Sequence, residues 1–336
     1  MSNFQGRDVK RSARIQVSRG MKTVLVGVVL LYLASYLLAP TSVSKVAQMG
    51  MLPFAACLAI VGLGQTLVIQ QGGIDLSVAG AVSLTVVIVT WGPDRVDSKL
   101  VPAVVAAFLA AIITGLINGF LITKTRINSI VATLGVNALL YGVMIGLSGG
   151  SPRRTTERLS NFTNNKFLGL PHSIYFGIIT TILVTLVIKR TVIGRKFEAI
   201  GANPRAAHTT GHNVARYQIG GYVSAQILYC IAGVILGGVI SQPTAYQGDD
   251  YVLPSVAVVV LGGTSLLGGR GFPAASALAA LFLKQLDMFV LSLGVPYGVR
   301  TIVISVSLML GIALYAFNWS SIRSKSKERD GQLQPV

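Results

Sequence analysis

The sequence predicts an all-α integral membrane protein of about ten transmembrane helices. Its 336 residues are 52% hydrophobic and only 12% charged, whereas a soluble domain has about 25% charged residues. Several long stretches contain no charged residue, and the basic residues gather between them. Backbone polar groups inside lipid must bond to one another, so uncharged runs of this length indicate helices.

Six stretches without Asp, Glu, Lys or Arg are each long enough to cross the hydrocarbon core, which takes about 20 mostly apolar residues. They are Thr23–Ser44, Val46–Ile74, Leu100–Thr123, Ile127–Pro152, Tyr217–Gly248 and Thr301–Ile322. Working outward from them, we predict helices at residues 23–40, 46–70, 75–92, 100–123, 129–148, 173–189, 217–240, 252–267, 272–292 and 299–318. Pro53, Gly62 and Gly64 predict a bend or break in the second helix.

The positions of Lys and Arg predict the orientation, because cytoplasmic loops are enriched in them. With both termini inside, nineteen of the 28 basic residues are cytoplasmic, seven are outside and two lie near the membrane. We therefore predict a basic cytoplasmic N-terminus (1–22), a transmembrane domain (23–318) and a cytoplasmic tail (319–336). The domain has a periplasmic loop at 149–172 and a cytoplasmic loop at 190–216. This distribution explains the net charge of +17 and argues against a nucleic-acid partner.

Four glycine-rich blocks follow one another between residues 64 and 271. They read GQTLVIQQGGIDLSVAG (64–80), GLINGFLI with a later TLG (115–135), GRKFEAIGANPRAAHTTG (194–211) and VLGGTSLLGGRG (260–271). Together they resemble the signature segments of the ribose/xylose/galactose-type ABC permeases, the membrane subunits of bacterial sugar importers.

The resemblance implies a permease subunit in the bacterial inner membrane. Such a subunit translocates a monosaccharide or related polyol that a periplasmic binding protein delivers, and it works beside a second permease copy or homologue. ATP and Mg are expected on a separate ATPase subunit, with no cofactor on this chain. The sequence agrees, because no G-x-x-x-x-G-K-[ST] phosphate-binding loop is present.

The loop at 194–211 resembles the family's coupling segment, which docks on the ATPase. Asn203-Pro204 predicts a helix start within it. The resemblance assigns coupling to Arg195, Glu198, Asn203, Arg205, Ala206, Ala207 and Gly211. The alternative is an ordinary basic cytoplasmic loop.

Polar residues in or beside the apolar helices are the candidates for the translocation path or its gate, because polar groups inside a membrane need partners. They are Gln65, Asp75, Ser77, Asn118, Thr133 and Asn137. Asp75 either caps the helix that follows it or gates the inner mouth of the path. Asn118 and Thr133 hydrogen-bond either a sugar or neighbouring helices.

Two further groups have predicted roles in packing and docking. Glycines are predicted to permit close helix packing and tight turns at Gly115, Gly119, Gly262, Gly263, Gly268 and Gly269.

In the external loop, Arg153, Arg154 and Arg158 are candidates for docking an acidic binding-protein surface, or are simply exposed loop charges.

A secondary transporter driven by an ion gradient is the alternative function. Lys284 and Asp287 interrupt the ninth predicted helix three residues apart, so they share one helix face. They are predicted to form a self-neutralising pair, and the alternative function would use them as an ion relay.

A membrane enzyme is disfavoured. The histidines at 172, 208 and 212 fall in predicted loops, and only His208 and His212 have a metal-like spacing. Cys57 and Cys230 lie in apolar runs without ligand spacing. We predict no catalytic residue and no metal site.

Overall fold

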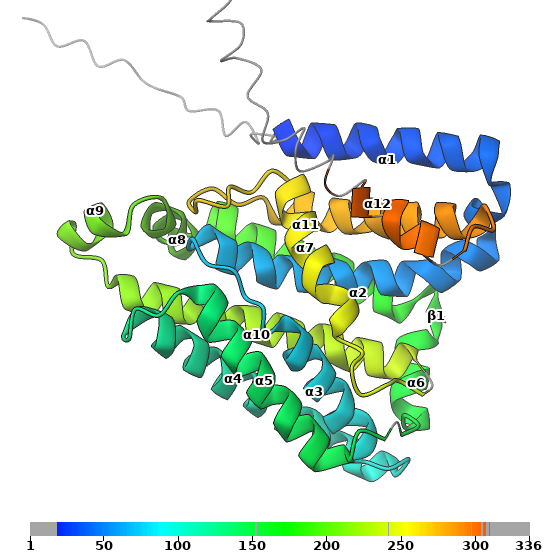
Figure 1. The fold of residues 1–336 in the computed structure, drawn as a ribbon, viewed down its shortest axis with the longest axis horizontal. Coiled ribbons are helices and arrows are strands. Elements are labelled where there is room, and N and C mark those ends of the chain that lie inside the picture. Colours follow the sequence, from blue (N-terminus) through cyan, green and yellow to red (C-terminus); the bar gives the residue numbers. More distant parts are fainter. Residues whose placement is uncertain are drawn as a thin grey trace, which may run out of the picture.

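The computed structural model describes residues 19–151, 153–240, 242–296, 298–303, 305–306 and 309. Within this part the chain is an all-α membrane protein (Figure 1). Seven of its helices are long and apolar enough to cross a membrane. They are α1 (Arg19–Leu38), α2 (Lys45–Gln70), α4 (Leu100–Thr123), α5 (Ser129–Ser148), α7 (His172–Arg190), α10 (Val214–Val239) and α12 (Pro273–Ser292).

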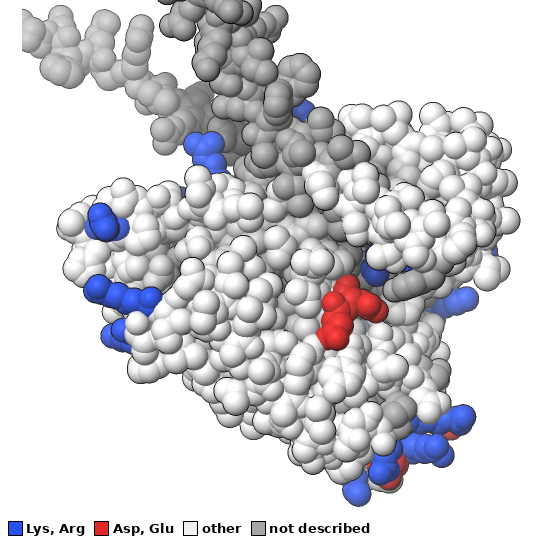
Figure 2. All heavy atoms as spheres, viewed as in Figure 1, with Lys and Arg blue, Asp and Glu red and all other residues white. Residues whose placement is uncertain are grey.

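The long helices run between two ends of the molecule (Figure 1). The α9 end carries α8 (Val192–Ala202) and α9 (Pro204–Thr209). The α6 end carries α6 (Glu157–Asn164) and a small antiparallel hairpin of β1 (Lys166–Phe167) and β2 (Leu170–Pro171). Short 3-10 helices are η1 (Pro40–Val43), η2 (Asp97–Lys99) and η3 (Asp249–Tyr251). Figure 2 shows the basic side chains of one face mainly at the two ends, with an almost uncharged surface between them.

Helix α2 forms the centre of the bundle and packs against α7, α10, α11 (Val252–Leu261) and α12. Every residue from Ala55 to Gln70 is buried. The helix is continuous through Pro53, so the predicted break does not occur there. Gly62 and Gly64 serve close packing instead, because a Cβ on them would lie 2.6 Å from Val258 and Tyr229 respectively.

Helices α4 and α10 approach each other closely at two of the predicted packing glycines. A Cβ on Gly115 would lie 2.5 Å from the Cα of Val223, and a Cβ on Gly119 would lie 2.8 Å from the Cα of Ile219. Small residues permit this backbone contact in membrane helices. The close contact sets the relative position of α4 and α10, which both contribute residues to the polar site described below.

Two predicted spans are half-length helices. Helix α3 (Val78–Trp91) has 14 residues and α11 has 10. At a rise of 1.5 Å per residue they are about 21 and 15 Å long, short of the roughly 30 Å hydrocarbon core. The prediction of a helix through 267 was wrong, because a glycine-rich loop follows Leu261 in which Gly263, Gly268 and Gly269 have positive φ.

An irregular segment that enters the bundle precedes each half-helix (Figure 1). Residues 71–77 enter from the α9 end, and α3 then runs to the α6 end, where Trp91 meets Arg153. Residues 242–251 enter from the α6 end, and α11 then runs to the α9 end, where Gly262 meets Gly20. Irregular backbone at membrane depth is tolerated where protein buries it or where it lines a water-filled cavity.

The predicted tenth helix, at 299–318, lies largely outside the described residues, of which 298–303 are helical. The predicted tail at 319–336 and most of the N-terminal segment also lie outside them.

Candidate functional site

The candidate site is built around Asp75, in the connection between α2 and α3. Its side chain is fully buried. One carboxylate oxygen accepts hydrogen bonds from the Ser77 backbone N–H (2.9 Å) and hydroxyl (2.5 Å). The other accepts from the Gln226 amide nitrogen (3.0 Å). Asp75 thus closes the turn that leads into α3 and ties this turn to α10, whereas the N-cap position of α3 is Ser77, which makes no side-chain cap hydrogen bond.

The Ser77 hydroxyl links the start of α3 to α4 and α10. While it donates to Asp75, it accepts from the amide nitrogens of Asn118 on α4 and Gln226 on α10, each at 2.8 Å. All three polar side chains have 0% exposure. Buried polar networks of this kind fix one arrangement of their helices, because every lost partner leaves a costly unpaired group.

The Gln65 amide connects α2 to the same connection. Its oxygen accepts from the Asp75 backbone N–H and its nitrogen donates to the Asp75 carbonyl oxygen, both at 3.2 Å. The nitrogen also lies 2.8 Å from the Tyr229 hydroxyl on α10. Gln65 therefore supplies hydrogen bonds to backbone that has left the helical ladder.

Helix α5 supplies hydrogen-bond acceptors for the start of α3. Ser129 accepts from the N–H of residue 74 (3.2 Å), Thr133 from that of residue 76 (2.9 Å) and Asn137 from that of residue 80 (2.7 Å). These side chains are four residues apart, so they share one face of α5. Two of these N–H groups belong to the connection before α3, and the third, of residue 80, lies in the first turn of α3, where N–H groups lack intrahelical partners.

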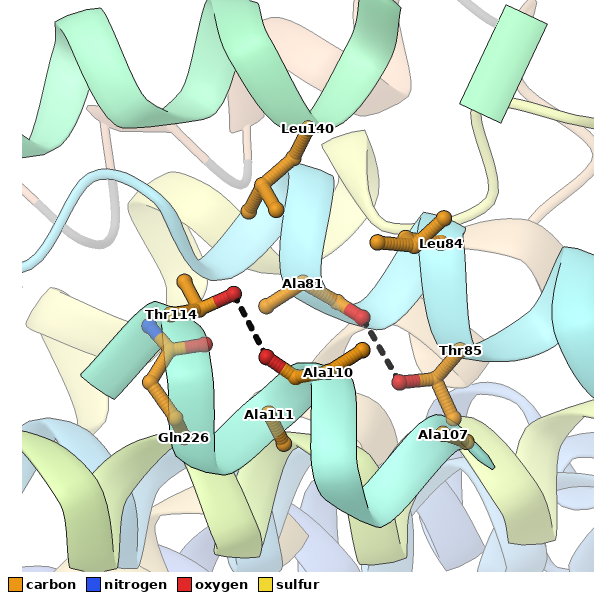
Figure 3. A pocket seen from close by; sticks show the side chains of 9 residues that line it. All are labelled: Ala81, Leu84, Thr85, Ala107, Ala110, Ala111, Thr114, Leu140 and Gln226. Carbon is orange, nitrogen blue, oxygen red and sulfur yellow. Dashed lines mark hydrogen bonds between the residues drawn. The ribbon is translucent and has the colours of Figure 1, made fainter. Parts of the chain in front are cut away.

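Within the network around Ser77, two buried acceptors lack hydrogen-bond partners among the described residues: the amide oxygens of Gln226 and Asn118. Figure 3 shows the Gln226 oxygen turned toward a small cavity between α3, α4 and α5. The cavity of about 10 Å³ has room for about one water molecule. Its lining comprises Ala81, Leu84, Thr85, Ala107, Ala110, Ala111, Thr114, Leu140 and Gln226.

The structure brings all six predicted path or gate residues to the α2–α3 connection or the start of α3. Asn118 and Thr133 bond to neighbouring parts of the chain. Sequence reasoning missed Gln226 and Tyr229. Gln226 carries the signal that identified Asn118, a polar side chain inside an uncharged apolar run.

The predicted coupling segment forms α8 and α9. The predicted helix start is present, because the Asn203 side chain accepts from the Ala206 N–H (3.0 Å) and caps α9. Glu198 pairs with Lys189 (2.6 Å). Ala207 is only 6% exposed and packs inward, whereas five predicted residues are exposed: Arg195, Asn203, Arg205, Ala206 and Gly211.

Helix α8 is fastened to the α2–α3 connection. The Gln71 side chain donates to the Phe197 carbonyl oxygen (2.9 Å). Gly201 lies so close to α2 that a Cβ would overlap the Gln70 carbonyl oxygen. That same oxygen accepts from the Gly269 N–H (2.8 Å). The surface helices and the loop after α11 thus meet where α2 ends.

The predicted docking arginines lie at the α6 end. Arg153 pairs with Asp94 (2.6 Å) and lies over the Trp91 ring, 5.3 Å from its centroid. The hydrogen bond from Arg153 holds the pKa of Asp94 below its usual value. Arg154 and Arg158 are exposed. Arg153 is thus already engaged within the chain.

Lys284 and Asp287 do not pair with each other, so the prediction of a self-neutralising pair was wrong. Asp287 pairs with Arg300 (2.6 Å). The Lys284 ammonium lies 5.7 Å from the centroid of the Tyr251 ring. The spacing of three residues places both side chains on one face of α12. Each of them interacts with a residue of another segment, however.

The described residues hold no group of three or more His, Cys, Asp or Glu side chains placed to bind a metal ion. Cys57 and Cys230 are both free and buried. The site is a hydrogen-bonding network that holds the backbone of the α2–α3 connection.

Residues 49–313 match the family described as "Branched-chain amino acid transport system / permease component". The ribose import permease protein RbsC of Bacillus subtilis (strain 168) is 30% identical over 86% of this chain and 90% of its own length. The RbsC of Escherichia coli (strain K12) is 33% identical over 76% and 80% of the two chains. The autoinducer 2 import system permease protein LsrD of Salmonella paratyphi B is 32% identical over 71% and 74%. No solved structure matches the chain.

The family match covers well over half of the chain, and the relatives align over most of their length. These likenesses agree with a helical membrane protein that has seven candidate spans among its described residues. The chain therefore belongs to the family of ABC importer permeases that includes the sugar import permeases.

Proposed function

We propose that this chain translocates a monosaccharide or related polyol through the bacterial inner membrane, using ATP hydrolysed on a separate ATPase subunit. A periplasmic binding protein delivers the substrate, and a second permease copy or homologue completes the path. The observation that carries the proposal is the fastening of α8 to the connection that holds Asp75. The sugar class is supported by relatives named for ribose and autoinducer 2.

The α9 end is the cytoplasmic side in this proposal. Eleven described Lys and Arg residues belong to this end and seven to the α6 end, in the direction of the positive-inside rule. The exposed Arg195 and Arg205 then meet acidic groups on the ATPase, and the exposed Arg154 and Arg158 meet the binding protein.

The α2–α3 connection is the proposed gate. A push on α8–α9 reaches Gln70 and Gln71 directly, because α8 contacts both residues. The connection then exchanges its hydrogen bonds to Gln226 and Gln65 for others, which gives two arrangements of the same segment. The ATPase shifts the balance between them through the different contacts that it makes with each.

The test is uptake by vesicles that contain this chain with its candidate ATPase and binding protein. Labelled ribose, other monosaccharides, polyols and leucine are compared with and without ATP. Leucine belongs in the panel because the family description names branched-chain amino acids. ATP-dependent uptake of a sugar, lost when Arg205 and Ala206 are both replaced by Glu, is the expected result.

Two results would contradict the proposal. Uptake of leucine but no sugar would assign another substrate class. Uptake that continues without ATP and stops when the ion gradient is dissipated would favour the secondary transporter, although the separation of Lys284 from Asp287 already deprives that alternative of its predicted relay.

A further inference from the structure

With both termini inside and helices predicted at 217–240 and 252–267, the acidic turn between these two helices is expected outside the membrane. In the structure the turn packs into the bundle. The Gly248 N–H donates to the Ser83 hydroxyl of α3 (2.9 Å), and a Cβ on Gly248 would overlap the Ala79 carbonyl oxygen. Ala245 and Tyr251 are 4% and 3% exposed. The turn is therefore held against the first two turns of α3.

Contacts with α5 and α12 set the depth of this turn. The Tyr141 hydroxyl donates to the Asp249 carboxylate, and Tyr141 precedes the last residue of α5 by seven positions. At 1.5 Å per residue, that is about 10 Å along a helix whose 20 residues match the hydrocarbon core. On the other side, Tyr251 lies beside Lys284 in the middle of α12.

Two carboxylates are nevertheless exposed at this depth. Asp249 and Asp250 are both exposed, and Tyr246 is 47% exposed. In Figure 2 an acidic patch stands on an otherwise almost uncharged face, at the place where Figure 1 shows the start of α11. Within the described residues, neither aspartate has a cation within ion-pair distance.

A lipid environment does not suit this face. A carboxylate at the bilayer centre costs at least about 2.5–3.5 kcal/mol, so such groups face protein or a water-filled cavity.

Two tyrosine rings lie beside the carboxylates. Tyr141 and Tyr246 meet edge to face, with centroids 5.4 Å apart. Carboxylates accept hydrogen bonds from hydroxyl groups, and the exposed Tyr246 ring and the half-buried Tyr141 ring offer apolar surface to the C–H faces of a sugar.

We infer that the face formed by Tyr141, Tyr246, Asp249 and Asp250, the acidic–aromatic face, borders a water-filled path and contacts a neutral polyhydroxylated solute during its passage. This inference rests on the proposed function and names a contact region for its substrate. The negative charge also repels anionic solutes, so the face favours neutral sugars over sugar acids.

Cysteine labelling tests the environment of the face. With Cys57 and Cys230 replaced by Ala, a single cysteine is placed at Tyr246 and, in a matched control, at Ile179. Ile179 is 58% exposed and lies seven positions from the start of α7 at the same end, on a surface without charged neighbours in its helix turn. We expect a charged methanethiosulfonate to label Y246C at least tenfold faster than I179C, because the reactive thiolate forms in water.

Equal, slow labelling at both positions would overturn the inference. Saturating ribose, or the sugar found by the uptake assay, is expected to slow labelling of Y246C at least threefold. Rapid labelling that no sugar in the panel slows would overturn the solute contact. The comparison of Y246C with I179C needs neither ATPase nor binding protein, so its result is separate from failure of the uptake test.

Charge removal tests selectivity. The double substitution Asp249→Asn and Asp250→Asn keeps side-chain size but removes both charges. We expect the ratio of ribonate to ribose uptake to rise at least fivefold, while Asp97→Asn at the exposed α6 end leaves the ratio unchanged. An unchanged ratio in the double variant, with ribose uptake intact, would contradict the role of the charges.

Discussion

At the residue scale, the site depends on a donor and acceptor balance around Ser77 and Asp75. Asp75 accepts three hydrogen bonds, and Ser77 accepts two while donating one. Each of these side chains is buried away from lipid and solvent. A substitution that keeps the shape but changes a donor into an acceptor therefore acts on the network alone.

Replacing Asp75 by Asn places a donor against the Gln226 amide nitrogen or the Ser77 hydroxyl. We expect this substitution to lower the free energy of unfolding by about 1–3 kcal/mol. We also expect it to reduce sugar uptake at least tenfold. Adding Gln226→Glu restores an acceptor opposite the new amide and is expected to recover part of both losses. Thermal unfolding in detergent and vesicle uptake measure the two effects, and a double variant worse than either single one would refute the pairing.

Because Asp287 pairs with Arg300 and not with Lys284, we expect an energetic coupling only for the first pair. A double-mutant cycle between Asp287→Asn and Arg300→Gln is expected to show a coupling energy of about 0.5 kcal/mol or more, whereas the cycle between Lys284→Met and Asp287→Asn stays within about 0.3 kcal/mol. Thermal unfolding supplies both cycles. A larger coupling for the second pair would restore the predicted ion pair on α12.

At the element scale, α8 acts through its contact with the end of α2. Gly201 permits this contact, because any side chain there meets the Gln70 carbonyl oxygen. The Phe197 side chain of α8 is buried, and its backbone carbonyl oxygen accepts a hydrogen bond from the Gln71 side chain. In the proposed function, a movement of α8 and α9 is therefore passed to Gln70 and Gln71, where the proposed gate begins.

Gly201→Ala is expected to push α8 away from α2 and to reduce the sugar imported per ATP hydrolysed at least fivefold, with ATP hydrolysis retained. Gly50→Ala is the matched control, because no atom lies within 4 Å of a Cβ built on that helical glycine. Simultaneous assays of hydrolysis and uptake measure the ratio. Normal coupling in Gly201→Ala, with the protein folded, would rule out transmission through this contact.

At the scale of the whole molecule, the sequence predicted the class of fold and the composition of the site better than their geometry. Uncharged runs located the long helices, and polar residues within those runs located Gln65, Asn118 and Thr133. Hydropathy does not separate a full span from an irregular segment followed by a half-helix, so α11 was predicted too long. Asp249 and Asp250 were placed outside, because the burial of Gly248 against α3 depends on tertiary contacts.

In the proposed mechanism, the α2–α3 connection moves when the ATPase binds nucleotide. The most direct measurement is the labelling rate of a single cysteine at Leu76 in the assembled transporter, with and without trapped ATP. We predict a rate change of at least fivefold that disappears when Arg205 and Ala206 are replaced by Glu. An identical rate in every nucleotide state of an actively transporting complex would contradict the claim.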